Sequence, residues 1–212
     1  MPRTAAPPLH PRKTPMQARS AVTVDAILSA TIQVLLADGQ ERLTTTRVAY
    51  RAGVSVGTLY QYFPNKQALL RAVLERHLDE VVTAVERACE QHRGRTLEDM
   101  ASALINAFLD AKMKSIRTSA ALYAISSDID GVRISREMGR RVCDAISAML
   151  ATAPAPLTTE PMRLAELLQG AMTGIVRRLI ESSAPHRLHD SYRAEMIRLA
   201  SAYLAASTRP AP

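Results

Sequence analysis

The sequence predicts an all-α fold in which a small N-terminal domain precedes a larger helical one. From residue 24 onward the apolar side chains recur at the three- and four-residue spacing of amphipathic helices. No segment shows the strict alternation of a strand, and Gly or Pro falls at the breaks between the periodic segments. The length of 212 residues fits a small domain joined to a larger one. We place these domains at residues 19–66 and 67–208.

Residues 1–18 are predicted to form a disordered basic arm. They contain five of the twelve prolines, together with Arg3, Arg12 and Lys13, and they lack the apolar core of a signal peptide. No uninterrupted apolar run along the chain predicts a membrane span, and two cysteines do not make a disulfide framework. We therefore expect a cytoplasmic protein that does not contact a membrane.

The N-terminal domain begins with two predicted helices. An apolar stripe over residues 24–35 predicts the first, and Gly39 ends it. The second is a short helix over residues 46–52. It has N-cap candidates at Thr44–Thr46 and ends at Gly53.

A third predicted helix, over residues 56–63, follows after a tight turn. Ser55 is its natural N-cap and Pro64 stops it. At about 100° per residue, Leu59 and Phe63 define its buried side. The opposite, exposed face carries Gly57, Thr58 and Gln61, with Tyr60 and Tyr62 on either side of it. Two short helices joined by such a turn have the size and spacing of a DNA-reading helix-turn-helix.

The stretch Gly53–Gly57 also has the G-x-S-x-G pattern of a hydrolase nucleophile elbow, which would make Ser55 a nucleophile. That pattern requires a strand before the serine, whereas residues 46–52 have the period and cap of a helix. A serine hydrolase is therefore the weaker interpretation, and we expect no enzyme activity.

The positive charge is concentrated at the N-terminal end of the chain. Residues 1–66 carry eight basic and three acidic side chains, a net +5, whereas the rest carries 19 and 17, a net +2. Solubilising arginines could produce such a cluster by chance, but a polyanionic partner is the stronger interpretation.

The C-terminal part is predicted to contain only helices. Asn65 caps a long helix that Gly94 ends, and Thr96–Asp99 resembles a capping box for the next. Asp128–Gly131 lacks the acidic residue that completes a calcium loop, so we interpret it as a turn. The five histidines show no metal-ligand spacing, and no metal or cofactor is expected. The predicted helical stretches are 69–89, 100–109, 117–127, 132–152, 164–179 and 192–203.

The residues from Thr45 to Leu69 closely resemble the signature of the TetR family of transcriptional regulators. The pattern T-T-R-V-A-x-R-A-G-V-S-x-G-T-L-Y-x-Y-F-x-N-K-x-x-L matches at many fixed positions, and the resemblance covers roughly residues 20–75. It implies an all-helical homodimer. Its N-terminal helices would bind a palindromic operator, and its variable C-terminal domain would bind a small ligand that releases the DNA.

The resemblance places family DNA-facing positions at Thr45, Thr46, Val56, Gly57, Thr58, Tyr60, Tyr62 and Lys66, and often at Arg47. To these we add Ser55 and also Gln61, because Gln61 is the one residue of the reading helix that can bond a base in bidentate fashion. Tyr50 departs from the polar residue common at its position and is left out of the predicted site.

For the C-terminal domain the resemblance implies a role without residues. Methionine-rich helices adapt to varied apolar guests, although core filling is the commoner use of any single methionine. The candidate ligand contacts are Leu104, Phe108, Arg117, Tyr123, Met138 and Met172.

The last two helices carry apolar stripes wide enough to need burial on two sides, which predicts a homodimer through them. Together with the resemblance to the TetR family, the sequence thus predicts a repressor that a small ligand releases from a palindromic operator. Two alternatives stay open, a serine hydrolase using Ser55 and an activator or structural DNA-binding protein without a ligand.

Overall fold

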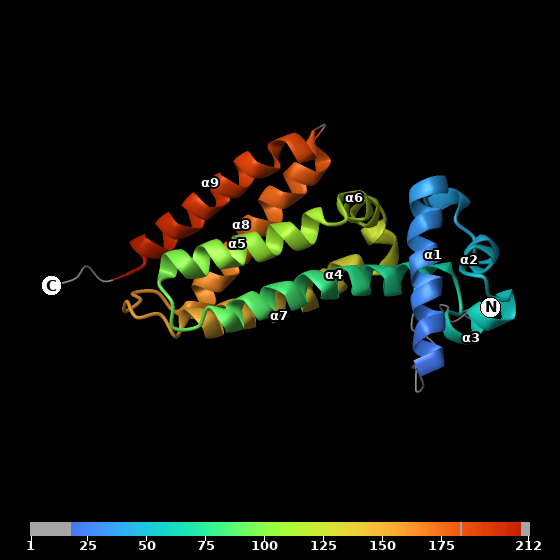
Figure 1. The fold of residues 1–212 in the computed structure, drawn as a ribbon, viewed down its shortest axis with the longest axis horizontal. Helices are drawn as coiled ribbons and strands as arrows, with labels where there is room; N and C mark the ends of the chain where they lie inside the picture. The colour runs from blue at the N-terminus through green and yellow to red at the C-terminus, as the bar shows by residue number, and fades with distance from the viewer. Residues whose placement is uncertain (1–17, 183, 209–212) are drawn as a thin grey trace, which may run out of the picture. The chain divides into compact units, whose positions relative to one another are not determined.

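A computed structural model describes residues 18–182 and 184–208 (Figure 1). The predicted basic arm, apart from its last residue, lies outside the described residues. Within them the chain forms nine α-helices and one short 3-10 helix, which confirms the all-α prediction. The helices are α1 (Ala18–Arg42), α2 (Thr45–Ala52), α3 (Val56–Tyr62), α4 (Lys66–Gln91), α5 (Leu97–Met113), α6 (Ile116–Ile125), α7 (Gly131–Leu150), α8 (Pro161–Glu181) and α9 (Pro185–Ala206).

The chain divides into two compact units. The first comprises the chain up to His77 together with Ala120–Ile134, and the second comprises Leu78–Ser119 and the chain from Ser135 onward. The helix α4 therefore contributes to both units, and so does α6, of which only the part from Ala120 onward belongs to the first unit.

The first unit is built on α1, α2 and α3, which pack in sequence order (Figure 1). The apolar stripe of α1 is buried, including Ile27 and Leu28, as predicted. At Gly39 the backbone leaves the helical region, with φ 77°, so the predicted stop is a kink three residues before α1 ends at Arg42. The first helix is thus longer than its apolar stripe at both ends.

Between Ser20 and Arg42 this helix is long and apolar enough to cross a membrane, a property that the apolar runs in the sequence did not indicate. Helix packing accounts for it, because Ile27, Leu28 and Val34 are buried and α1 packs on α2. Such a composition is expected of a core helix as well as of a membrane span.

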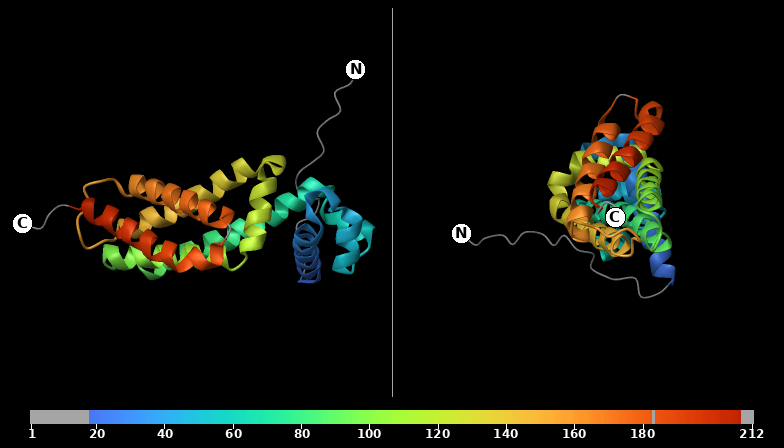
Figure 2. Two further views of the ribbon diagram at one scale, coloured as in Figure 1. Left: turned by 90° about the horizontal axis from the view of Figure 1, so that it is seen from above. Right: turned by 90° about the vertical axis from the view of Figure 1, so that its left-hand side faces the viewer.

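In the second unit α5 and α8 both pack against α9 (Figure 2). The predicted capping box is partly confirmed: the Thr96 hydroxyl accepts a hydrogen bond from the Asp99 backbone N–H at 3.1 Å. Pro161 lies in the first turn of α8, where its missing N–H costs no helical hydrogen bond.

The turn predicted at Asp128–Gly131 is confirmed. The 3-10 helix Ser126–Ile129 leads into Asp130, whose φ of 58° is left-handed. At Gly131 a Cβ atom would lie 2.5 Å from the Ser126 carbonyl oxygen, so the chain needs glycine there to begin α7.

Candidate DNA-binding and ligand-binding sites

The turn between α2 and α3 is fixed by backbone hydrogen bonds and two caps. Gly53 takes a left-handed conformation, and the N–H of Val54 bonds the Ala49 carbonyl at 3.0 Å. The Thr44 side chain caps α2 and the Ser55 hydroxyl caps α3, accepting from the Thr58 N–H at 3.0 Å. The two helices are therefore held as a helix-turn-helix by their own termini.

The faces of α3 follow the predicted helical wheel. Leu59 and Phe63 are almost completely buried. On the other side Val56, Gly57 and Gln61 are exposed, Tyr60 is 40% exposed, and Thr58 and Tyr62 are half-buried. A Cβ atom on Gly57 would meet only the Ser55 hydroxyl, at 3.7 Å, so the fold itself does not require glycine at this position.

Both tyrosine hydroxyls of α3 are held by other helices of the same unit. The Tyr60 hydroxyl lies 3.0 Å from the Thr45 hydroxyl at the start of α2. The Tyr62 hydroxyl lies 3.0 Å from the Ser20 hydroxyl in the first turns of α1. Each phenol oxygen can take part in a further hydrogen bond, so both are oriented and still able to bind an external oxygen.

The predicted cationic contacts have partners inside the unit. The Arg47 guanidinium forms an ion pair with Asp38 at 2.9 Å, and the Lys66 ammonium donates to the Gln40 carbonyl at 2.5 Å. Thr46 is exposed beside Arg47 at the start of α2. Since Thr44 makes the cap, the side chains of Thr45 and Thr46 are not used to cap this helix.

Sequence reasoning set Tyr50 aside, and the structure shows that it does not pack in this unit. Its side chain is 89% exposed and lines a groove of about 520 Å³ between α1 and α2. The only sign of this in the sequence was that a tyrosine replaces the polar residue that is common at this position. The groove is lined by Gln33, Val34, Ala37, Asp38, Thr46, Arg47, Tyr50 and Arg51.

The first unit also contains a buried guanidinium, which sequence reasoning missed. Arg71 of α4 bonds Glu75 at 2.9 Å and reaches Asp130 at 3.4 Å. Asp130 also accepts from Arg133 at 2.7 Å, and this hydrogen bond, with the charges of both arginines, holds the pKa of the Asp130 carboxyl below its ordinary value. The chain before α7 is thereby attached to α4.

The candidate ligand contacts have different environments. Leu104 and Phe108 of α5 and Met172 of α8 are buried in the second unit, and Met138 is half-buried there. Arg117 is exposed, and Tyr123 is half-buried in the first unit. The three fully buried candidates are apolar, and Arg117, the one charged candidate, is exposed.

Lys112 continues the stripe of Leu104 and Phe108 at the same four-residue spacing, and it is 4% exposed. Burial lowers the pKa of its ammonium to about 8. The helical period could have identified this position, because the stripe reaches a lysine where another apolar residue is expected.

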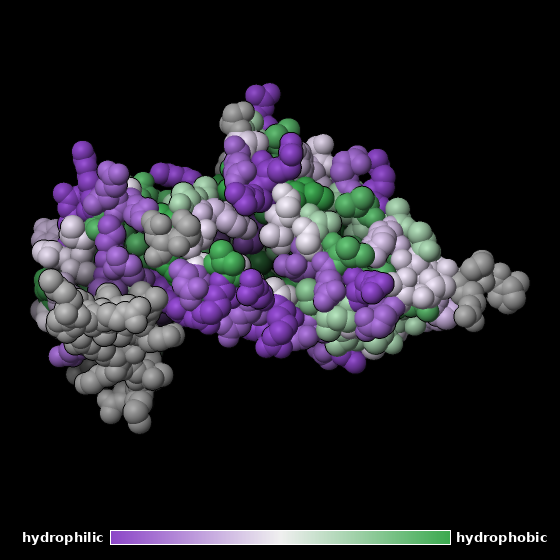
Figure 3. All heavy atoms as spheres, turned by 180° about the vertical axis from the view of Figure 1, so that it is seen from behind, coloured by the Kyte–Doolittle hydropathy of each residue, from purple (hydrophilic) through white to green (hydrophobic). Residues whose placement is uncertain are grey.

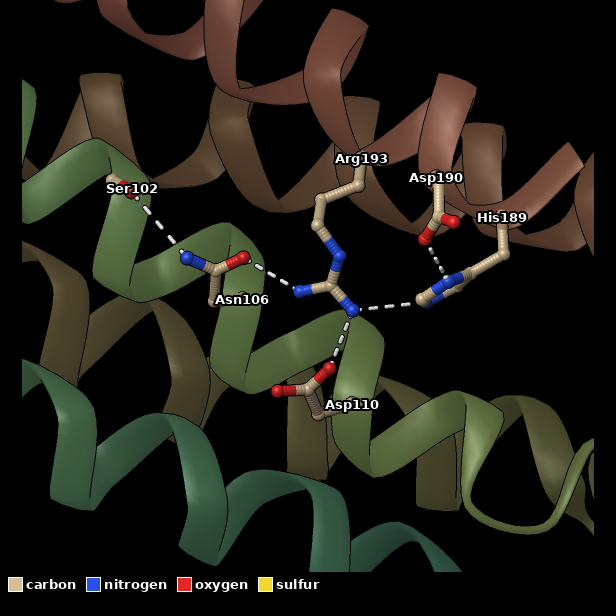
Figure 4. A network of polar contacts seen from close by, with 6 residues as sticks. All are labelled: Ser102, Asn106, Asp110, His189, Asp190 and Arg193. Carbon is tan, nitrogen blue, oxygen red and sulfur yellow. Dashed lines mark hydrogen bonds and ion pairs between the residues drawn. The ribbon is translucent and has the colours of Figure 1, made fainter.

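A polar network fixes α9 on α5 (Figure 4). Arg193 donates to Asn106 at 2.6 Å and to the Asp110 carboxylate, and its third contact is His189 Nε2 at 2.9 Å. Because a guanidinium can only donate, Nε2 accepts and Nδ1 carries the proton that bonds Asp190 at 3.1 Å. Arg193 thus connects α9 to two polar side chains of α5.

The two cysteines are buried structural residues. Burial, with the charge of Glu86, raises the pKa of the Cys89 thiol to about 12, and burial also raises the pKa of Cys143. Both thiols are therefore protonated near neutral pH and poorly reactive. In the described part of the chain no three His, Cys, Asp or Glu side chains are grouped to hold a metal ion.

Comparison with known proteins agrees with this arrangement. Residues 27–73 match the bacterial regulatory proteins of the tetR family, and residues 96–204, half of the chain, match the tetracyclin repressor-like C-terminal domain. The chain thus has the N-terminal helix-turn-helix and the helical C-terminal part that define a class of transcriptional regulators. It belongs to the TetR family, which is a family of regulators and not of enzymes.

Individual curated relatives match only part of the chain. The HTH-type transcriptional repressor KstR of Mycolicibacterium smegmatis is 42% identical over 62 residues, which are 29% of this chain and 30% of that protein. The chain thus spans less than a third of the first curated relatives it matches.

Solved structures show the same fold over most of the chain. A TetR-family regulator from Mesorhizobium loti is 18% identical, with a TM-score of 0.73 over 91% of this chain and 100% of that one. A complex of SmeT with triclosan is 21% identical, with a TM-score of 0.67 over 89% and 92% of the two chains.

Proposed function

We propose that the protein is a homodimeric, cytoplasmic repressor that binds a palindromic operator through α3 and is released by a small ligand. The observation that carries the DNA-binding part is the exposed face of α3. It has a glycine at its centre that the fold does not require, and a tyrosine hydroxyl held by a neighbouring helix on either side.

This face suits the major groove of DNA. Gly57 has no side chain, so the helix can approach base edges closely, while Tyr60 and Tyr62 reach the phosphates on either side. Thr45 and Thr46 add hydroxyls and the free N–H groups at the start of α2, which favour a phosphate.

Base recognition needs further groups. Gln61 is exposed on α3 and can bond adenine in bidentate fashion, and Arg47 can reach DNA if it exchanges Asp38 for a phosphate or a guanine. With so few base readers, we infer that sequence-dependent DNA shape contributes to operator choice. The Ser55 and Thr58 hydroxyls are hydrogen-bonded at 2.8 Å, and we assign both residues to positioning the start of α3. Val56 would contact a thymine methyl group, and Lys66 would contact a phosphate.

The outer surface of α8 and α9 supports a dimer. Figure 3 shows one face of the molecule, on which hydrophobic residues lie among hydrophilic ones. Leu167 of α8 is 55% exposed and Leu199 of α9 is 52% exposed. Leu199 lines a largely apolar groove of about 430 Å³ together with Ile175, Tyr192 and Met196. A second copy of this surface, placed by a two-fold axis, would bury these side chains on both protomers.

The ligand part of the proposal is supported by the buried candidates on α5 and α8 and by the triclosan complex of SmeT, whose fold this chain shares. A ligand against Leu104, Phe108 and Met172 would be largely apolar, with Met138 adapting to its shape. A compound that binds there is recognised by loss of operator binding.

Residues 120–134 give the ligand a route to the DNA-binding helices. This segment belongs to the first unit, and Arg71 attaches its Asp130 to α4. It is joined to the second unit by the chain before Ala120 and after Ile134. Displacement of those connections by a ligand would bias the spacing of the two α3 helices, and only one spacing fits DNA.

The DNA-binding proposal is tested with the double variant Tyr60→Phe/Tyr62→Phe, which removes only the two hydroxyls. A dimer then loses four phosphate contacts, and we expect affinity for an operator selected from random duplexes to fall by at least about 2 kcal/mol, roughly 30-fold. The measurement is fluorescence anisotropy of the labelled duplex at fixed salt.

The fold should be retained, because the Thr45 and Ser20 hydroxyls are near the surface and return to water. Tyr203→Phe in the second unit is the matched control and should bind as the parent does. Parent-like affinity in the double variant, with circular dichroism unchanged, would show that these hydroxyls do not contact DNA.

A further inference from the structure

A groove of about 520 Å³ lies between α1 and α2, within the first unit. Val34 and Ala37 of α1 contribute apolar side chains to it, and Tyr50 of α2 adds an aromatic ring that is 89% exposed. Because the rest of the unit covers so little of this ring, packing of the fold does not account for a tyrosine here. An exposed ring beside an apolar groove is instead typical of a binding surface.

The groove is lined by more positive than negative charge. Its charged residues are Arg47, Arg51 and Asp38, which gives a net charge of +1. Arg47 forms an ion pair with Asp38 at 2.9 Å. The Arg51 Nε, by contrast, donates to the neutral side chain of Gln33 at 2.6 Å. A guanidinium has further N–H donors that can bond an anion at the same time. The groove therefore favours an occupant that carries negative charge and has some apolar surface.

The groove continues the surface that the proposed function places on DNA. Thr46 and Arg47, which that function assigns to DNA contacts, line the groove as well. Tyr50 and Arg51 each follow one of them at a four-residue spacing, so the two pairs lie on one face of α2, about 5.4 Å apart along its axis. The side chains of a helix lean toward its N-terminus, which directs the second pair back toward the first. A DNA strand that contacts the start of α2 is therefore within reach of both pairs.

We propose that this groove binds the sugar-phosphate backbone of DNA, with Tyr50 and Arg51 contacting a phosphate next to the one at Thr46. Neighbouring phosphates of one strand advance by about 3.4 Å along the duplex axis, so a second phosphate lies close to residues one helical turn away. Arg51 pairs with its charge, the Tyr50 hydroxyl donates to one of its oxygens, and the phenol ring covers the adjoining sugar. Such contacts do not depend on the base sequence, so they strengthen binding to every duplex. This inference rests on the proposed function, because it needs the start of α2 to be on DNA.

The test is the double variant Tyr50→Phe/Arg51→Gln, which removes one hydroxyl and one charge from an exposed surface. Anisotropy titrations over a range of salt concentrations give its affinity for the selected operator and for an unrelated duplex of the same length. Each phosphate contact contributes about 0.9 to the slope of log affinity against log salt, so its loss from both protomers should reduce the slope by about 1.8. We expect the affinity near 0.1 M salt to fall at least about tenfold, by the same factor on both duplexes.

The matched control, Arg136→Gln/Tyr203→Phe, removes the same groups from the second unit and should keep the parent's affinity and slope. Parent-like affinity and slope in the groove variant would overturn the proposal, and so would an equal loss in both variants, because net charge alone would then explain it. Parent-like DNA binding, together with binding of an oligoglutamate peptide that the groove variant loses, would assign the groove to an acidic protein partner instead. If the parent selects no operator, the proposed function fails before the two variants are compared.

Discussion

Replacing Gly57 by leucine is expected to weaken operator binding at least about a hundredfold while the protein stays folded. A Cβ at this position meets only the Ser55 hydroxyl, at an ordinary contact distance of 3.7 Å, and the backbone is not in the left-handed region. Alanine and leucine also favour a helix by about 0.5–1 kcal/mol over glycine. Any loss of operator binding would therefore come from overlap between the new side chain and the DNA that lies against this face.

The effect should increase with side-chain size. We expect Gly57→Ala to lower operator affinity about tenfold and Gly57→Leu at least about a hundredfold, because forced overlaps in a tight contact cost about 1–3 kcal/mol. Anisotropy titrations give the affinities, and thermal unfolding verifies the fold. Ala148→Leu, on an exposed position of α7, adds a leucine elsewhere and should have no effect. Parent-like binding by Gly57→Leu would mean that α3 does not approach DNA with this face.

The second large effect is on stability. Phe63 is 1% exposed, and its backbone N–H bonds the Leu59 carbonyl at the end of α3 at 2.9 Å. Phe63→Ala leaves a cavity under the reading helix and should lower the free energy of unfolding by about 3–5 kcal/mol. Urea unfolding followed by circular dichroism measures the loss, and operator affinity should fall with it because α3 loses its support.

Tyr50→Ala provides the comparison, since it truncates an aromatic residue of the same unit that is 89% exposed. Its unfolding free energy should stay within about 0.5 kcal/mol of the parent. Similar losses in both variants would mean that Phe63 does not support α3 in the way its burial indicates.

The local features of the first unit could be predicted from the sequence because they depend on residues that are close together along the chain. Ser55 caps α3 and Asn65 caps α4, where the Ala68 N–H bonds the Asn65 side chain at 2.8 Å. Gly53 takes the left-handed conformation that ends α2. The helical period placed Leu59 in the core. For the cap of α2 the sequence offered three adjacent threonines, and only the backbone geometry selects Thr44.

Features that depend on tertiary packing could not be predicted. The bond between Ser20 and Tyr62 joins residues 42 positions apart, and the Arg71–Asp130 pair joins residues 59 apart. The sequence of the short helix α6 does not show which of its faces is buried. The exposure of Arg117 could therefore not be predicted. The candidate ligand contacts come from several helices, and a single sequence does not say which of them meet.

In the proposed function, the two copies of α3 in a dimer read a palindrome from adjacent major grooves. Hydroxyl-radical footprinting of the full chain on its selected operator tests this most directly. Two symmetry-related protected segments are expected, with centres one DNA turn apart, about 34–36 Å, or a multiple of it. A single protected segment without symmetry, or uniform protection along the duplex, would contradict it.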